Sequence, residues 1–401
     1  MENKRTNAQD IAKGLLIIGV VAFHSYLMVY PNYRDVLQDF NILMAIIPFI
    51  ISTFFFYSGY NYNPSSRSTK ENIARRAKQL LIPFVIAFVV STVLISSMEL
   101  AFHHDNVRET FVSLGNSILY NLMSEPLSLM IKFPQSGGMV FELTLALGLL
   151  WFLYALFLCS VIFFFVVKYT NKKLSSFISV VLALLILSFC LGQFVAPYLP
   201  YSIQCYPIII AIMLTGSYIK QHNNILDNKV ESKKDIVFKV INMLIAEGLI
   251  IAICLLCYYQ FGAILVGSLP GGQFNAILKG YDAFISYAFA FLGVYFLHHL
   301  ARLISHIPGL RFSLQWIGKR SAIFYLFHPI FIDFIGIVFF QKQMIWGIWQ
   351  AILYMISSLL LLVGVCLIID LISKKFKKKD IVEDENPSIG NENGTGNTIS
   401  S

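Results

Sequence analysis

Apolar stretches follow one another almost from end to end of this chain, separated by short polar segments. A helix that crosses the hydrocarbon of a bilayer needs about 20 mostly apolar residues. In lipid, such helices satisfy their backbone polar groups internally. The pattern therefore predicts an all-α polytopic membrane protein with about ten transmembrane helices, at about 11–30, 40–60, 80–102, 140–167, 176–195, 205–219, 237–259, 281–301, 321–340 and 347–372.

The distribution of basic residues predicts the orientation of these spans. Charged residues make up 13% of the 401 residues, against about 25% in soluble domains. With the N-terminus placed in the cytoplasm, 25 of the 30 Lys and Arg residues fall in cytoplasmic segments, as the positive-inside rule requires. Both termini are therefore expected to be cytoplasmic. The formal charge of +8 is explained by basic edges facing membrane lipid, and no nucleic-acid partner is expected.

The chain is expected to form one membrane domain, residues 1–379, followed by a short tail. Residues 380–401 are polar and lack aromatic residues, so we expect them to be disordered. Cys254 and Cys257 form a CxxC pattern inside an apolar stretch without further ligands, so no metal site is predicted.

Ionisable residues inside predicted spans are candidates for function, because they are costly in hydrocarbon and usually face an interior cavity. His24 lies in the first span. Lys13 lies 11 residues earlier, about 1100° around the helix, so both share one face about 16 Å apart. His328 is followed by Pro329, which removes a backbone hydrogen bond from the ninth span. Glu142 opens the fourth span near its outer end. A structural histidine that bonds a neighbouring helix is the competing interpretation of His24.

A basic cluster precedes the third span and includes Arg75 and Arg76. As a positive-inside loop it needs no further function. As a site, guanidinium groups at a cytoplasmic mouth would bind phosphates.

Five motifs in order resemble the acyltransferase-3 family of bacterial membrane acyltransferases. They are DIAKGLLIIGVVAFHS with Lys13 and His24, FFFYSGY at 54–60 with Ser58, ARRAKQLLIPF at 74–84, LWFLYALF at 150–157, and IGKRSAIFYLFHPIF at 317–331 with Tyr325 and His328. Lys13 stands where arginine is commoner in the family, and Gln79 where many relatives carry a basic residue. Some relatives carry an extra extracellular hydrolase-like domain, and here only a short tail follows the last span.

The resemblance implies transfer of an acyl group, most often acetyl, from cytoplasmic acetyl-CoA to a hydroxyl of an extracellular glycan or lipid-linked sugar, in the bacterial plasma membrane. Donor binding is expected at Lys13, Arg75, Arg76, Ser58 and Tyr325. His24 is expected to act as general base or as transient acyl carrier, since a group with a pKa of about 6.5 serves near neutral pH. Glu142 is expected to orient the acceptor, and His328 to polarise the thioester or line the cavity.

Two other functions fit the same residues. A transporter or flippase would use the polar interior as a permeation path and need no acyl donor. A non-catalytic scaffold in glycan assembly would tolerate changes at His24 and Arg76. The sequence does not identify the acceptor or the acyl chain length, and it leaves a homodimer open.

Overall fold

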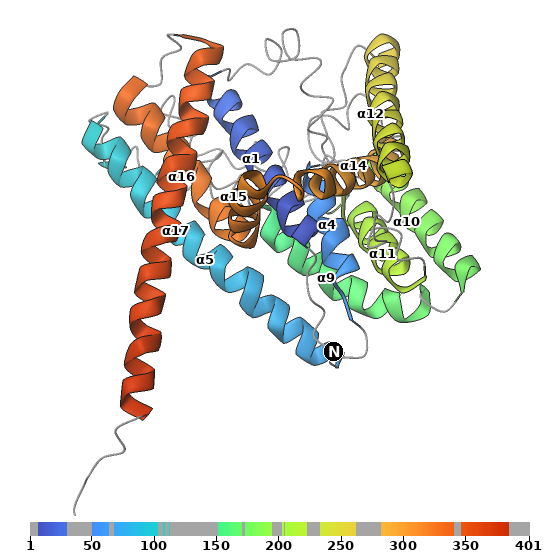
Figure 1. Cartoon of the computed structure of the whole chain (residues 1–401), viewed down its shortest axis with the longest axis horizontal. Helices are drawn as coiled ribbons and strands as arrows, with labels where there is room; N and C mark the ends of the chain where they lie inside the picture. The colour runs from blue at the N-terminus through green and yellow to red at the C-terminus, as the bar shows by residue number, and fades with distance from the viewer. Residues whose placement is uncertain are drawn as a thin grey trace, which may run out of the picture.

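The structure is a computed structural model that describes residues 7–29, 50–63, 68–102, 107, 108, 112, 151–170, 173–194, 203, 205–222, 233–261, 282–340 and 346–384. These residues are helical almost throughout and contain no strand. The helices are α1 (Asn7–Val29), α4 (Ile50–Tyr60), α5 (Thr69–Phe102), α9 (Trp151–Thr170), α10 (Leu174–Phe194), α11 (Tyr206–His222), α12 (Lys233–Phe261), α14 (Asp282–Ile304), α15 (Pro308–Lys319), α16 (Ser321–Phe340) and α17 (Ile348–Asp384) (Figure 1).

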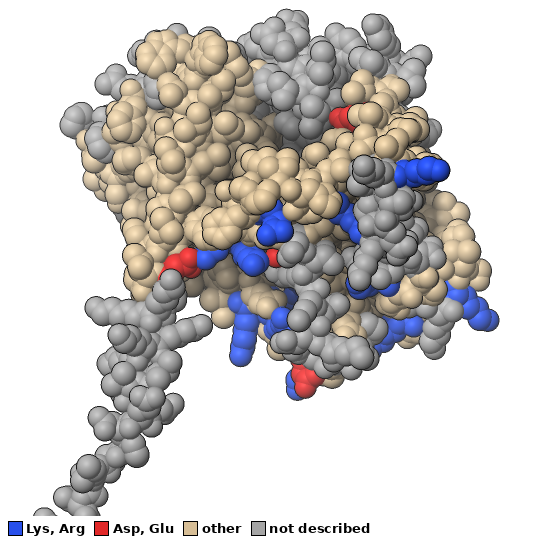
Figure 2. All heavy atoms as spheres, in the orientation of Figure 1, with Lys and Arg blue, Asp and Glu red and all other residues tan. Residues whose placement is uncertain are grey.

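Within the described residues, five helices are long and apolar enough to cross a membrane, namely α1, α5, α9, α10 and α17. Shorter apolar stretches lie in α14 and α16. The prediction of an all-α polytopic membrane protein is confirmed, whereas the number of ten spans and the cytoplasmic placement of both termini stay predictions. On the face shown in Figure 2, lysine and arginine side chains lie mostly across the middle and lower parts of the molecule, and the tan surface at the upper left shows no charged side chain.

Three boundaries differ from the sequence-based expectation. Helix α5 begins at Thr69, well before residue 80, because a capping box stabilises its start: the Ser68 N–H donates to Glu71 Oε2 at 2.9 Å, and the Glu71 N–H donates to Ser68 Oγ at 3.2 Å. The basic cluster is thus helical. Helix α17 continues to Asp384, past the predicted start of the tail at residue 380, and residues 385–401 lie outside the described residues.

Helix α15 is the third difference, because it lies between the predicted spans 281–301 and 321–340, where no helix was predicted. Pro308 occupies its first turn, where a missing N–H costs nothing. With 12 residues, the helix is too short for a membrane span and escapes a search for apolar stretches. It buries Leu314 and Gly318 and packs along α1.

The core is centred on α11, which is buried from Tyr206 to Ser217 and packs against α4, α9 and α10. Its contact with α4 is made through glycines. A Cβ on Gly59 would overlap the Met213 carbonyl, and one on Gly216 would overlap the Phe56 carbonyl. Small residues allow membrane helices to approach backbone to backbone in this way.

The α1–α15 contact has the same character. A Cβ on Gly14 would overlap the carbonyl of Leu314, and one on Gly318 would overlap the carbonyl of Asp10. The two helices therefore touch at two glycines, one from each helix.

We expect Gly59→Ala to destabilise the protein, because the added methyl group meets a backbone atom that no rotamer change can move aside. Overpacking of this kind costs about 1–3 kcal/mol or more. The melting temperature in detergent should fall clearly. Gly248→Ala in α12 is the matched control, since its Cβ meets nothing within 4 Å. Equal melting temperatures for the two variants would contradict the packing argument.

Candidate active site

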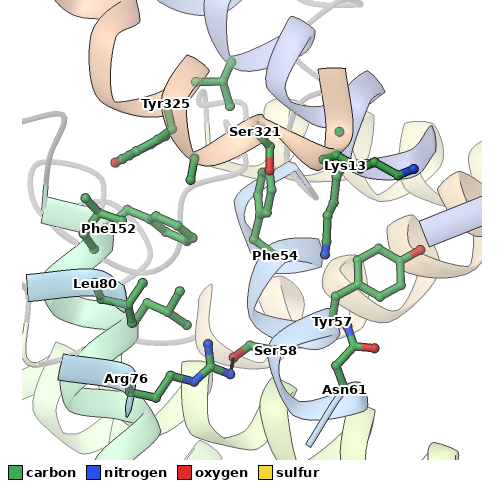
Figure 3. Close-up of a pocket in the computed structure, with 16 residues that line it drawn as sticks. Lys13, Phe54, Tyr57, Ser58, Asn61, Arg76, Leu80, Phe152, Ser321 and Tyr325 are labelled. Atoms are coloured by element: carbon green, nitrogen blue, oxygen red, sulfur yellow. Dashed lines mark hydrogen bonds between the residues drawn. The ribbon is translucent and has the colours of Figure 1, made fainter. Parts of the chain in front are cut away.

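A cavity of about 250 Å³ lies between α1, α4, α5, α9 and the junction of α15 with α16 (Figure 3). It is slightly smaller than the roughly 300–1,000 Å³ usual for small-molecule sites. Its lining residues are Lys13, Val20, Phe54, Tyr57, Ser58, Asn61, Arg76, Leu80, Phe152, Leu153, Leu156, Gly318, Lys319, Ser321, Ala322 and Tyr325.

The charged residues of the lining are all basic. They are Lys13, Arg76 and Lys319, and none of the described lining residues is acidic. The Arg76 Nη2 donates a hydrogen bond of 2.8 Å to Ser58 Oγ, which holds the guanidinium at the wall (Figure 3). Charge-assisted donors in this number favour an anionic group such as a phosphate.

The rest of the lining is apolar and aromatic, from Phe54, Leu80, Phe152, Leu153 and Leu156. Tyr325 lies at the same wall as Phe152, with ring centroids 5.2 Å apart. The cavity thus joins a charged region to an apolar one, which suits a ligand with a phosphate head and an apolar chain.

Two histidines meet beyond the apolar part. His328 Nε2 and His24 Nδ1 are 2.9 Å apart, which joins α16 to α1 across 304 positions of sequence. Neither lines the cavity, but each is next to a residue that does: the His328 ring lies 5.7 Å from that of Tyr325, and Val20 precedes His24 by one helical turn. The imidazole pair therefore stands one side chain beyond the cavity.

Pro329 determines how this pair is hydrogen-bonded. A residue at position 329 would normally donate its backbone N–H to the carbonyl of Tyr325, and proline has no N–H. His328 Nδ1 lies 2.7 Å from that same carbonyl oxygen. Since a carbonyl only accepts, Nδ1 carries the proton and donates. The side chain of His328 thus replaces the backbone bond that Pro329 removes.

The proton on His328 Nδ1 assigns the remaining nitrogens. A neutral imidazole has one donor and one acceptor, so His328 Nε2 accepts and His24 Nδ1–H donates to it. His24 Nε2 is then the ring nitrogen that keeps its lone pair. A side chain in this state can take up a proton or attack an electrophile.

An ion pair fixes the junction of α15 and α16. Arg320 lies between these helices, pairs with Asp370 of α17, and donates to the Trp316 carbonyl at 3.2 Å. Its guanidinium also lies 4.3 Å over the Trp316 ring. Lys319 and Ser321 flank Arg320 in sequence and line the cavity. The contacts of Arg320 therefore help to hold these two residues in place.

The structure brings most of the predicted site residues together. Lys13, Ser58, Arg76 and Tyr325 line the cavity. His24 and His328 form the pair behind it.

Two predicted site residues are not part of this assembly. Arg75 is exposed and does not line the cavity, although it neighbours Arg76 in sequence. Glu142 lies outside the described residues.

Sequence reasoning missed several lining residues. Lys319 and Ser321 belong to the Gly-Lys-Arg-Ser run, which carried a signal because of its resemblance to the late family motif. Phe152 could not be distinguished in the sequence from the other aromatic residues of its apolar span. Tyr57 and Asn61 flank Ser58 by one residue and by about one turn, so their positions follow once the helical phase of α4 is known.

Comparison with known proteins identifies the relatives of this chain. The model of the acyltransferase-3 family, described as an acyltransferase domain, matches residues 7–371. No curated protein and no solved structure matches the chain. Because the match spans nearly the whole chain and the fold is that of a helical membrane protein, this chain belongs to the acyltransferase-3 family and is a membrane acyltransferase.

Proposed function

We propose that the protein is an O-acyltransferase that moves an acetyl group from cytoplasmic acetyl-CoA to a hydroxyl of an extracellular glycan or lipid-linked sugar in the bacterial plasma membrane. The observation that carries the proposal is the His24–His328 pair just beyond the apolar part of a cavity whose charged lining residues are all basic. The proposed reaction uses no metal ion.

The donor occupies the cavity from the charged region inward. Phosphates of the nucleotide bind Arg76 and Lys13, with Lys319 beside them. From these phosphates the pantetheine chain extends into the apolar part of the cavity. Arg75 faces outward and contributes only long-range attraction.

His24 removes the proton from the acceptor hydroxyl through Nε2, the nitrogen that keeps its lone pair. The alkoxide oxygen attacks the thioester carbonyl, the C–S bond breaks as the C–O bond forms, and the proton passes to the leaving thiolate. In the variant with an acyl-histidine, Nε2 attacks the thioester carbonyl and the C–S bond breaks to release the thiolate. The acceptor hydroxyl then attacks the acyl group, the N–C bond to His24 breaks, and the hydroxyl proton passes to the thiolate. Both variants use the same nitrogen.

His328 acts as a positioning residue in this mechanism. Both of its ring nitrogens are engaged, one with the Tyr325 carbonyl and the other with His24. A neutral His328 therefore has no N–H left that could polarise a thioester. Its role is to hold His24 in one tautomer. Glu142 keeps its proposed task of orienting the acceptor.

The test uses the full-length protein in lipid vesicles with radiolabelled acetyl-CoA and a crude cell-envelope glycan fraction. Label that moves to glycan supports the proposal. Solute movement without consumption of acetyl-CoA would instead identify a transporter, and a protein that neither binds nor consumes the donor would support the scaffold interpretation.

We expect His24→Ala to lower the rate of transfer by at least about 10²–10⁴-fold, the usual contribution of general acid–base catalysis. His328→Ala should lower kcat while leaving the KM for acetyl-CoA nearly unchanged, because His328 does not line the donor cavity. The control is His222→Ala, which changes an exposed histidine at the end of α11 and should keep wild-type activity. Transfer at the wild-type rate by a well-folded His24→Ala protein would end the proposal.

We expect Arg75 and Arg76 to contribute differently to the binding of acetyl-CoA. Arg76→Gln should raise the KM for acetyl-CoA about 10- to 100-fold, because a hydrogen bond to a charged group contributes about 1.5–3 kcal/mol. Arg75→Gln carries the same change of charge on an exposed side chain and should alter the KM less than about threefold. Steady-state kinetics at varied donor concentration would show the difference, and equal effects would contradict the placement of the phosphates.

We expect Pro329→Ala to lower kcat without lowering the melting temperature. Alanine restores an N–H that competes with His328 Nδ1 for the Tyr325 carbonyl, so the tautomer of the pair is no longer fixed. A loss of about tenfold is the expected scale for a partner that orients a reacting histidine. Pro83→Ala in α5 is the control, since it also removes a proline from a helix interior. An undiminished kcat in Pro329→Ala would contradict this account of the tautomer.

A further inference from the structure

Two aromatic rings lie at the apolar end of the cavity. Phe152 of α9 and Tyr325 of α16 both line it, with ring centroids 5.2 Å apart (Figure 3). The Tyr325 ring is in turn 5.7 Å from the ring of His328, whereas neither histidine reaches the lining. A chain that enters from the charged region therefore meets these two rings before it meets the imidazole pair.

The ring of Phe152 has little freedom to move aside. It lies 4.9 Å from the ring of Phe55 and 5.8 Å from that of Phe54, measured between centroids. Phe152 is 6% exposed and Phe55 is fully buried. Side chains packed at this density move only if their neighbours move as well. The aromatic pair Phe152–Tyr325 is thus a fixed wall beside the path from the cavity to His24.

A fixed wall restricts what can be attached to the donor sulfur. The cavity of about 250 Å³ is smaller than the roughly 300–1,000 Å³ usual for small-molecule sites. Each further methylene of the acyl group would have to fit between the aromatic pair and His24. Rejection of one methylene by a hydrophobic pocket amounts to about 10- to 200-fold in kcat/KM.

We propose that Phe152 and Tyr325 set the acyl chain length, and that the protein accepts short acyl groups because this aromatic pair stops longer ones before they reach His24. This inference rests on the proposed function, since it concerns the acyl donor of that reaction. Phe152 is the specificity-determining residue that can be changed most cleanly, because it forms no part of the histidine pair.

The test measures acyl transfer by the full-length protein in lipid vesicles, with acetyl-, propionyl- and butyryl-CoA as labelled donors and a cell-envelope glycan fraction as acceptor. We expect the wild type to transfer acetyl at least about tenfold faster than butyryl. Phe152→Ala should raise the ratio of butyryl to acetyl transfer at least about tenfold, because it opens the wall.

Phe163→Ala is the matched control. It makes the same truncation in the same helix, at a fully buried ring that does not line the cavity, and should keep the wild-type ratio. Phe152→Leu covers the case in which the alanine variant does not fold, because it keeps more of the side-chain volume. Its ratio should lie between those of the wild type and Phe152→Ala.

The outcomes separate this inference from the function on which it rests. A wild type that transfers butyryl as fast as acetyl overturns the inference, and so does an unchanged ratio in folded Phe152 variants that still transfer acetyl. In both cases the proposed acyltransferase reaction stands. A wild type that transfers no acyl group from any donor overturns the proposed function and this inference with it.

Discussion

The candidate site depends on a backbone hydrogen bond that cannot form. Pro329 leaves the carbonyl of Tyr325 without its helical partner in the middle of an apolar helix, where no bulk water is present to satisfy it. The side chain of His328 fills that role, and its Nδ1 is thereby committed as a donor. The hydrogen bonds of both imidazoles follow from this one feature, in which a side-chain N–H takes the place of a backbone N–H at the Tyr325 carbonyl.

The same hydrogen bonds lower the free-energy cost of placing the two imidazole rings in an apolar environment. An imidazole without hydrogen bonds is expensive in an apolar interior, and a pair that satisfies itself is less so. His328 uses both nitrogens within the protein, and His24 Nε2 is the nitrogen of the pair that keeps its lone pair. In the proposed mechanism this is the reacting atom.

Much of the helical architecture could be predicted from the sequence, because hydrophobic stretches of membrane length are long and continuous. The helical phase of α1 also predicted that Lys13 and His24 share one face, although only Lys13 lines the cavity itself. The difference between Arg75 and Arg76 could not be predicted, since it depends on which face of α5 packs against α9 and α16. The pairing of His24 with His328 required knowledge of which helices are neighbours. Helix α15 was missed because a 12-residue amphipathic helix gives no membrane signal.

The segment from Gly318 to Tyr325 supplies residues to both ends of the cavity, Lys319 to its charged region and Tyr325 to its apolar one. It is also fixed at two points: Gly318 touches the backbone of α1, and Arg320 is paired with Asp370 of α17. A shift of this segment would move both ends at once. Substitutions between positions 318 and 325 should therefore show epistasis, because contacts that share one rigid support do not change independently. Within this chain, the entrance for the donor and the selection of its acyl group are constrained to evolve together.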